Sequence, residues 1–267
     1  MHTIFAKSFP TLALVSLISL VPLGTARAGT VVAWGANEHG QATVPAGLTN
    51  AAALSAGLYH DLALKSDGSV VAWGDNTYGQ TNVPAGLTNA VAVAAGFYHS
   101  MALRVDGMVV VWQWNDFGQT NVPAGLTDVV AISGGARQCL ALLPDGQVRA
   151  WGGNTAGEGT VPAGVSNVQA IACGESHNLV LKRDGTVVAW GWNPNGQTNV
   201  PAGLANVAAI ATMGDHNLAL KSNGTVVAWG FNGFGQATVP AGLSNVVAVA
   251  CGYNHSFALK PISCPCL

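Results

Sequence analysis

A repeat of 39 residues runs through the chain without an insertion. Near-identical stretches, VVAWGANEHGQATVPAGLTN from Val31 and VVAWGDNTYGQTNVPAGLTN from Val70, mark successive copies. The most regular markers are six tryptophans and six prolines, namely Trp34, Trp73, Trp112, Trp151, Trp190 and Trp229, with Pro45, Pro84, Pro123, Pro162, Pro201 and Pro240. A unit this short cannot bury its own apolar faces, so the fixed period predicts copies that stack on one another.

Each copy is predicted to contribute four short strands. In the second copy these are residues 81–84, 90–96, 99–105 and 108–112. Consecutive apolar residues, as in AVAVA and VVAW, are typical of strands that are covered on both faces. An Asp-Gly or Asn-Gly dipeptide joins the third strand to the fourth, which suits a two-residue hairpin loop with positive φ at both residues. These dipeptides begin at Asp67, Asp106, Asp145, Asp184 and Asn223.

Repeated antiparallel strands of this kind predict an all-β protein, a β-propeller of six four-stranded blades. A helical solenoid is the alternative, but no segment has its 3.6-residue period. The repeats begin with a fourth strand at Thr30 and end after a third strand at Lys260. Residues 30–34 are therefore expected to complete the last blade, which would close the ring and hide strand edges that could aggregate.

The first 28 residues have the pattern of a secretory signal peptide. Lys7 precedes an apolar run over residues 11–24, and Ala26-Arg27-Ala28 fits a cleavage site. The run is too short to serve as a membrane anchor. We therefore expect a signal peptide at 1–28, a propeller at 29–260 and a non-repeat tail at 261–267. The expected location is secreted or periplasmic, without membrane attachment after cleavage.

The charge of the repeat region argues against a nucleic-acid partner. Without Lys7 and Arg27, 8 basic residues face 12 acidic ones, a net charge of 8 − 12 = −4 with neutral histidines. A phosphate-binding surface requires a basic patch instead. Among the cysteines, Cys173 and Cys251 share one repeat position and are predicted to be small core residues. The tail cysteines Cys264 and Cys266 follow no repeat pattern.

The copies differ most in two loops, which strand direction places on one face of the propeller. These are the loop after each tryptophan and the turn before each third strand. Aromatic residues gather in them, and aromatic side chains dominate interface hot spots. The predicted partner-binding residues are Trp114, Trp192, Phe231, Tyr78, Phe117, Phe234, Tyr59, Tyr98, Arg137, Tyr253, Asp75 and Asp116. The alternative for each aromatic residue, that it only packs against a neighbouring loop, stays open.

The same loops also carry acidic residues, namely Glu38, Asp75, Asp116, Glu158, Glu175 and Asp215. The third copy is the most irregular, because Gln113 replaces a glycine and Arg137 and Gln138 replace the usual turn. If one blade dominates partner contact, we expect it to be this one.

Catalytic chemistry finds little support. Histidines open five of the third strands, at His60, His99, His177, His216 and His255. They lie one blade apart, too far to share a metal ion, and each is expected to fix its own turn by hydrogen bonds. Asp75 and Asp116 come from adjacent blades and could flank a glycosidic bond, but nothing in the sequence singles out that pair. No catalytic residue, metal or cofactor is therefore predicted.

The motifs WGxNxxGQ, VPAGL and AxGxxHSxAL resemble the regulator of chromosome condensation repeat family over residues 29–260. Within that family the chain is most similar to secreted bacterial beta-lactamase inhibitor proteins. Family members of this type typically have seven blades, and six copies are a departure from that number. The resemblance implies inhibition of a beta-lactamase or another secreted enzyme, with contacts made by the variable loops.

These observations predict a secreted, monomeric and non-enzymatic module that binds another macromolecule, a protein first of all. Carbohydrate binding is the alternative, with Trp114, Trp192 and Phe231 stacking on sugar rings. A glycoside hydrolase that uses loop carboxylates is the second alternative.

Overall fold

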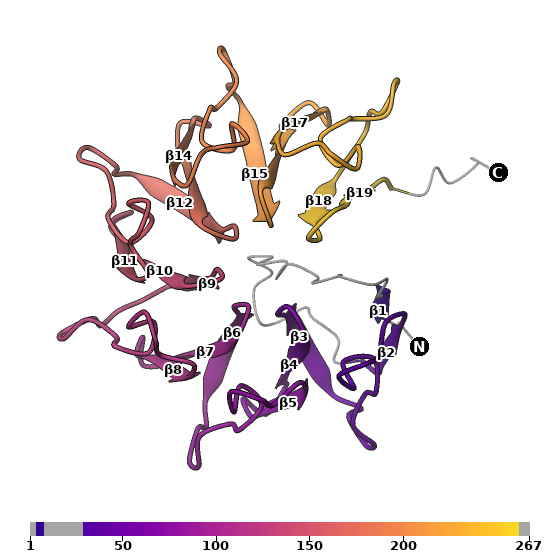
Figure 1. Cartoon of the computed structure of the whole chain (residues 1–267), viewed down its shortest axis with the longest axis vertical. Coiled ribbons are helices and arrows are strands. Elements are labelled where there is room, and N and C mark those ends of the chain that lie inside the picture. Colours follow the sequence, from indigo (N-terminus) through magenta and orange to yellow (C-terminus); the bar gives the residue numbers. More distant parts are fainter. Residues whose placement is uncertain (1–3, 8–28, 262–267) are drawn as a thin grey trace.

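The structure is a computed structural model that describes residues 4–7 and 29–261. Five antiparallel sheets of three strands stand around a central axis as the blades of a propeller (Figure 1). Their strands are β3 (Ala51–Ala56), β4 (His60–Lys65) and β5 (Val70–Gly74); β6 (Ala90–Ala95), β7 (His99–Arg104) and β8 (Val109–Gln113); β9 (Ala131–Gly134), β10 (Gln138–Leu142) and β11 (Val148–Gly152); β12 (Val168–Cys173), β13 (His177–Lys182) and β14 (Val187–Gly191); and β15 (Val207–Met213), β16 (His216–Lys221) and β17 (Val226–Gly230). The structure therefore supports a β-propeller.

The predicted first strand of each copy is not a strand in the structure. In the second copy, residues 81–84 form a turn followed by an irregular segment. The N–H group of Val83 donates to the carbonyl oxygen of Thr81, and that of Leu87 donates to Pro84. Pro84 itself has no N–H group, so little backbone remains for a sheet ladder. Val83 and Leu87 still pack against the buried core beside Trp112.

The predicted hairpin loop is also different. Lys65 N donates to the carbonyl oxygen of Ser69, which leaves three residues in the loop. Only the glycine has positive φ, 79° at Gly68, and the Asp67 carboxylate accepts the N–H group of Ser69. This is a type I turn closed by a left-handed glycine, a common hairpin loop of three residues. The prediction of two residues with positive φ was wrong.

The core lies between neighbouring blades. Leu62 and Leu64 of one blade pack with Val93, Ala102 and Trp112 of the next blade. Each buried tryptophan also donates its Nε1 hydrogen to a backbone carbonyl 32 residues earlier in the chain. The pairs are Trp73 with Gln41, Trp112 with Gln80, Trp151 with Gln119, Trp190 with Glu158 and Trp229 with Gln197. The repeated tryptophan therefore joins successive units.

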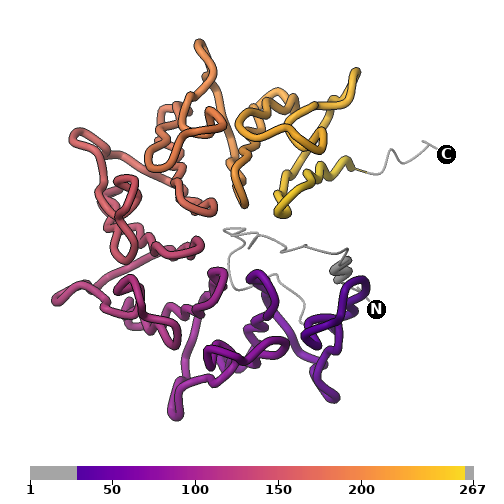
Figure 2. The backbone as a smooth tube through the Cα atoms, viewed as in Figure 1, coloured from indigo at the N-terminus to yellow at the C-terminus, as the bar shows by residue number. Residues whose placement is uncertain are grey.

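Two further sheets have only two strands each. β18 (Ala248–Cys251) pairs with β19 (Ser256–Leu259), and β2 (Val31–Trp34) pairs in parallel with β1 (Ile4–Lys7). Figure 1 shows these two sheets on opposite sides of a gap between the described blades, and Figure 2 shows the same gap between β2 and the β18–β19 sheet. The predicted completion of the last blade by residues 30–34 is therefore not confirmed, because β2 is paired with β1 instead.

Several predictions fall on other parts of the chain. Most of the predicted signal peptide, and Cys264 and Cys266 of the tail, lie outside the described residues. Cys173 and Cys251 are buried, free thiols, which confirms them as core residues. No helix within residues 4–7 and 29–261 is long and apolar enough to cross a membrane.

Candidate functional site

The two variable loops of each blade lie together on one face of the propeller, which we call the variable face. Tyr98, in the turn before β7, has its ring centroid 5.1 Å from that of Trp114, which follows β8. Backbone hydrogen bonds join the two loops in other blades, as from Asp75 N to Tyr59 O and from Trp192 N to Ser176 O. The shared face expected from strand direction is thus confirmed.

An aromatic cluster lies on this face, in the loops of two neighbouring blades. The Tyr78 ring lies 5.3 Å from Tyr98 and 5.9 Å from Trp114. The Phe117 ring lies 5.3 Å from Trp114 in an edge-to-face arrangement. The Arg137 guanidinium lies over the Phe117 ring, 4.6 Å from its centroid. Edge-to-face pairs and cation–π contacts of this kind hold the side chains in a defined arrangement.

A pocket of about 250 Å³ opens beside the aromatic cluster. Residues from four three-stranded blades and from the β18–β19 sheet contribute to its wall, among them Tyr59, Tyr98, Trp114, Arg137, Glu175 and Tyr253. Phe97, which we had not predicted as a site residue, also lines the pocket, with its ring 5.9 Å from that of Tyr253. The pocket combines aromatic walls with one basic and one acidic side chain, so it can recognise apolar and charged groups together.

Glu175 is the acidic group of this pocket. The Tyr253 hydroxyl donates a hydrogen bond to its carboxylate at 2.8 Å. Burial raises the pKa of Glu175, and the nearby charge of Asp215 acts in the same direction. Burial likewise raises the pKa of Tyr253, together with the Glu175 carboxylate that its hydroxyl contacts. A cation that entered the pocket would stabilise the ionised carboxylate.

Backbone strain lies directly before Trp114. Gln113 has φ of 77°, whereas Gly74 and Gly152 occupy the same repeat position with φ of 99° and 94°. A residue with a Cβ atom rarely adopts this conformation, which costs of order 1 kcal/mol. Strained residues of this type often occur at functional sites. The irregularity of the third copy, seen in the sequence, therefore has a structural counterpart beside the aromatic cluster.

Three predicted aromatic residues lie apart from the cluster. The Trp192 side chain is 49% exposed. Phe231 and Phe234 form a separate pair with centroids 6.0 Å apart, and Phe234 is 71% exposed. The structure therefore brings together most of the predicted aromatic residues, while these three stand on other blades of the ring.

The carboxylates of Asp75 and Asp116 accept hydrogen bonds from neighbouring side chains and do not face each other across an open catalytic site. Burial opposes ionisation of Asp75, but hydrogen bonds from Thr77 and Gln80 outweigh it and lower the pKa of the carboxyl. Asp116 accepts the indole hydrogen of Trp114 at 2.8 Å. Both carboxylates therefore fix loops of the variable face, an arrangement that gives the glycosidase alternative no support.

Glu158, one of the acidic residues that the sequence places in the variable loops, is not available to a partner. It is buried, and its carboxylate accepts the N–H groups of Thr155 and Ala156. Gln80 and Gln119 occupy the same repeat position and accept backbone N–H groups in the same way. The burial of Glu158 could have been predicted from the repeats, because a glutamine occupies the same position in the five other copies.

The repeated histidines join blades to one another. His60 Nε2 lies 2.9 Å from Ser100 Oγ, and His177 Nε2 lies 2.7 Å from Asn217 Oδ1, in each case in the following blade. The prediction that each histidine fixes its own turn was wrong. Burial lowers the pKa of His60 to about 4 and of His99 to about 3, so both are neutral at pH 7. Among the described residues, no group of His, Cys, Asp or Glu could hold a metal ion.

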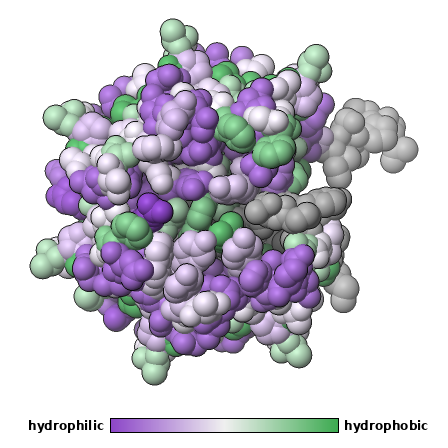
Figure 3. Space-filling model, viewed as in Figure 1, coloured by the Kyte–Doolittle hydropathy of each residue, from purple (hydrophilic) through white to green (hydrophobic). Residues whose placement is uncertain are grey.

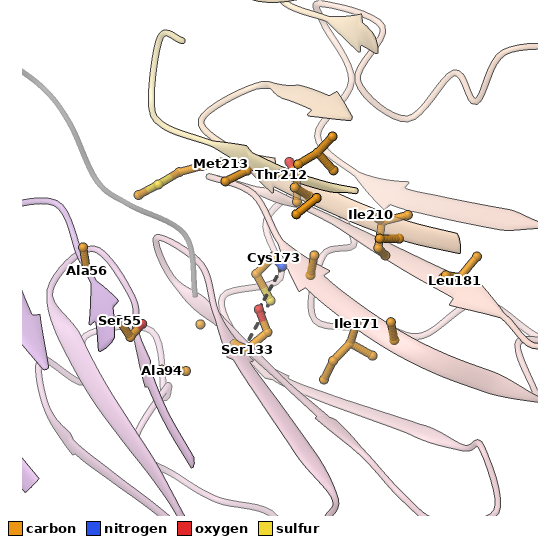
Figure 4. A pocket seen from close by; sticks show the side chains of 18 of the residues that line it. Ser55, Ala56, Ala94, Ser133, Ile171, Cys173, Leu181, Ile210, Thr212 and Met213 are labelled. Atoms are coloured by element: carbon orange, nitrogen blue, oxygen red, sulfur yellow. Dashed lines mark hydrogen bonds between the residues drawn. The ribbon is translucent and has the colours of Figure 1, made fainter. Parts of the chain in front are cut away.

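A second cavity, of about 430 Å³, lies between the inner strands of the blades (Figure 4). Alanine and serine side chains line much of it, and Cys173 N donates to Ser133 Oγ at its wall. Figure 3 shows apolar residues around the central opening and hydrophilic residues over the blades. Small side chains suit a place where inner strands converge, and the cavity offers few groups that could recognise a ligand.

Comparisons with known proteins agree with this architecture. Four segments, residues 51–80, 90–119, 168–197 and 207–236, match the family model "Regulator of chromosome condensation (RCC1) repeat". No curated protein sequence matches the chain.

Solved structures with the same fold were found. Prp20p from Saccharomyces cerevisiae is 19% identical, covers 95% of this chain and 80% of its own, and has a TM-score of 0.70. Yeast RCC1 (Prp20) in a structure with Kap60 is 20% identical over 79% of this chain and 68% of its own, with a TM-score of 0.66. The ectodomain of the Physcomitrella patens receptor kinase CR4 is 25% identical over 80% of this chain and 60% of its own, with a TM-score of 0.64.

The repeat matches and the structural neighbours support a propeller built from RCC1 repeats. The solved structures show the fold, a β-propeller, and the repeat model matches four of its blades.

Proposed function

We propose that this chain is a secreted, non-enzymatic module that binds another protein through its variable face. The observation that carries the proposal is the pocket in which rings from several blades meet Arg137 and Glu175. Aromatic and arginine side chains are the usual hot spots of protein interfaces. One of the similar propellers, yeast RCC1 (Prp20), is named with protein partners in two structures. One contains Kap60 bound to it, and the other reports its binding to Gsp1p and histones.

The pocket favours a partner that presents a basic side chain. Glu175 is half buried, and burial already disfavours its ionised form. A lysine or arginine from the partner would pair with that carboxylate and contact the aromatic rings of Tyr98 and Trp114. Arg137 is held over Phe117, and its charge lowers the pKa of Glu175 less than burial raises it.

Inhibition of a secreted enzyme, such as a beta-lactamase, is the specific form of this function that the sequence motifs suggest. It rests on the resemblance to secreted inhibitor propellers and on the signal peptide expected at residues 1–28. Release of the chain from cells with a new N-terminus at Gly29 would support secretion. Retention of Met1 on the exported protein, or retention of the whole chain in the cytoplasm, would contradict it.

Carbohydrate binding is the second candidate, and the half-exposed Trp192 indole favours it. An exposed indole away from a protein-binding cluster is a surface on which a sugar ring can stack. Loss of glycan binding in Trp192→Ala, with the binding retained in Trp114→Ala, would support this candidate. A glycan panel without any binding would exclude it.

Site-specific photo-crosslinking tests the protein-binding proposal directly. A photoreactive phenylalanine analogue replaces Arg137 on the variable face or, as the control, Val105 in an exposed hairpin of the opposite face. Crosslinks to one defined protein from position 137, with none from position 105, are the expected result. Equal crosslinking from both positions would contradict the proposed face.

A further inference from the structure

One glutamine beneath the variable face lacks a partner that its repeat equivalents have. Gln119 is fully buried, and its side-chain oxygen accepts the N–H group of Phe117, which fixes the orientation of the amide. The Nε2 atom of Gln119 has no hydrogen-bond partner among the described residues. A buried donor without an acceptor is costly, so this atom marks a place where an acceptor is missing.

In two other units a carboxylate is that acceptor. Gln80 Nε2 donates to Asp75 Oδ2 at 2.9 Å, and Gln197 Nε2 donates to Asp215 Oδ1 at 2.9 Å. Asp75 reaches its glutamine from the loop after the tryptophan, 5 residues earlier in the chain. Asp215 reaches its glutamine from the turn before β16, 18 residues later in the chain. The fold therefore offers two positions from which a carboxylate can satisfy this amide.

Neither position holds a carboxylate in the unit of Gln119. Trp114 occupies the position of Asp75, and Arg137 occupies the position of Asp215. Both of these side chains line the pocket of the variable face. This unit has therefore lost the internal acceptor and gained a positive charge at one of the two positions.

The Arg137 side chain is exposed, and its guanidinium contacts the Phe117 ring. Within residues 4–7 and 29–261, no hydrogen bond or ion pair reaches that guanidinium. Its charge acts on Glu175 without an ion pair between the two side chains. The planar fork of an arginine matches the two oxygens of a carboxylate, so Arg137 and an unpaired amide donor together suit an acidic group.

We propose that Arg137 and Gln119 form a carboxylate-binding subsite, which receives an acidic side chain of the protein partner. One carboxylate oxygen accepts a hydrogen bond from Gln119 Nε2, as the oxygens of Asp75 and Asp215 do in their own units. The other oxygen pairs with the Arg137 guanidinium. Because Gln119 Nε2 is buried, the Arg137 side chain moves away from Phe117 as the carboxylate enters. Only the source of the carboxylate, a partner protein, rests on the proposed function.

Gln236 provides an internal control for this subsite. Its Nε2 atom is also buried without a hydrogen-bond partner among the described residues. Phe231 and Asn254 occupy the two acceptor positions in its unit, so neither position carries a cation. An unpaired amide alone is therefore present at Gln236, whereas an unpaired amide and a guanidinium are present together at Gln119.

NMR spectroscopy of the isotope-labelled full chain tests the subsite directly. The probe is N-acetyl-aspartate N-methylamide, a model of an acidic side chain, and the control is the uncharged asparagine compound. We expect the acidic probe alone to shift the side-chain amide resonance of Gln119, while the resonances of Gln80, Gln197 and Gln236 stay unchanged. Equal shifts at Gln119 and Gln236, or no shift at Gln119, would overturn the proposal. An equal shift with sodium sulfate would overturn the assignment to a carboxylate.

Two variants remove one half of the subsite each. Arg137→Ala should weaken binding of the acidic probe by about tenfold or more, the change expected when a charge-assisted contact is lost. Gln119→Glu removes the donor but keeps an acceptor for the Phe117 N–H group, because Glu158 accepts the N–H group of Ala156 at the same repeat position. This second variant should bind no probe, as reported by the backbone amide resonance of Phe117. Unchanged probe affinity in either variant would overturn the proposal.

Arg137→Asp gives a readout that needs no probe. An aspartate at this position corresponds to Asp215, so it should accept the hydrogen bond from Gln119 Nε2. The side-chain amide resonance of Gln119 should then move toward that of Gln197, and added probe should no longer shift it. A Gln119 resonance that Arg137→Asp leaves unchanged would overturn the proposal.

The free probe tests this subsite whether or not the photo-crosslink from position 137 captures a protein. Probe binding without a crosslinked protein would support the subsite and contradict the proposed function. A crosslinked protein without probe binding would support the proposed function and overturn the subsite.

Discussion

His177 Nε2 lies 2.7 Å from Asn217 Oδ1, although the two residues belong to different blades. Asn217 uses its Nδ2 group to donate to the Gln197 carbonyl oxygen in the loop between those blades. One asparagine side chain thus joins a strand, a neighbouring strand and the intervening loop. Both residues are fully buried, so the contact acts as a polar connection inside an otherwise apolar interface.

Asn217→Ala is expected to destabilise the protein by about 2 kcal/mol, because it leaves the His177 Nε2 and Gln197 O groups buried without these partners. Chemical denaturation measures the free energy of unfolding. Asn195→Ala, on the protein surface, serves as the control and should change stability by less than about 0.5 kcal/mol. If Asn217→Ala changed the free energy of unfolding as little as the control does, the histidine contacts would not contribute to the association of the blades.

Stability should fall as the pH decreases below about 6.5. Burial lowers the pKa of His60 to about 4, so the unfolded chain binds a proton at a pH where the folded chain does not. The stabilisation is present above the unfolded value of 6.5 and is lost as the pH falls from there to about 4. Each pKa unit is worth about 1.4 kcal/mol, which gives roughly 3 kcal/mol for this histidine.

His60→Gln tests this origin of the pH dependence, because Gln138 already fills the same position in another blade. The variant should lose less stability than the unchanged protein between about pH 7 and pH 4.5. Thermal unfolding at several pH values provides the comparison. Parallel curves for the two proteins would assign the acid sensitivity to other groups.

The repeat period predicted the propeller well because one tryptophan per unit makes the same contact in each blade. Trp112 and Trp151 both donate to a carbonyl 32 residues earlier, so a constant sequence spacing reflects a constant spatial relationship. The segment around Pro84 misled the prediction of four strands. Its valine, Val83, is partly buried against the core, but the backbone there forms local hydrogen bonds. The side-chain pattern alone does not distinguish such a segment from a strand.

Trp114→Ala should reduce partner binding by at least about 2 kcal/mol, as expected of an aromatic hot spot. It should also cost about 1–3 kcal/mol of stability, because the indole contacts the rings of Tyr98 and Phe117. Phe234→Ala is the matched control, since that ring is exposed and lies apart from the cluster. Calorimetric titration with the crosslinked partner measures binding, and denaturation measures stability.

If Trp114→Ala and Phe234→Ala lost the same amount of binding, the binding surface would have to include residues outside the aromatic cluster. Unchanged binding in Trp114→Ala, in a protein that remains folded, would exclude the cluster as the partner site. Denaturation distinguishes these cases from loss of the fold, because the buried clusters between the other blades do not contain Trp114.

Strand direction predicted that Tyr98 and Trp114 would share a face, because antiparallel strands return alternate loops to the same end. It could not predict which loops would meet in one pocket. Glu175 reaches Tyr253 from a position 78 residues away, and this contact depends on the convergence of the turns near the axis. The separation of Trp192 from the cluster likewise depends on positions around the ring, which a repeat pattern does not specify.

Gln113→Gly should stabilise the protein by about 1 kcal/mol, because φ of 77° is favourable for glycine and costly for glutamine. Asn89→Gly is the control, since asparagine already tolerates φ of 57° and little change is expected there. If the strained backbone holds Trp114 in place for binding, the stabilised Gln113→Gly variant should also bind its partner more weakly. Tighter binding with higher stability would instead show that the strain at Gln113 has no role in presenting Trp114.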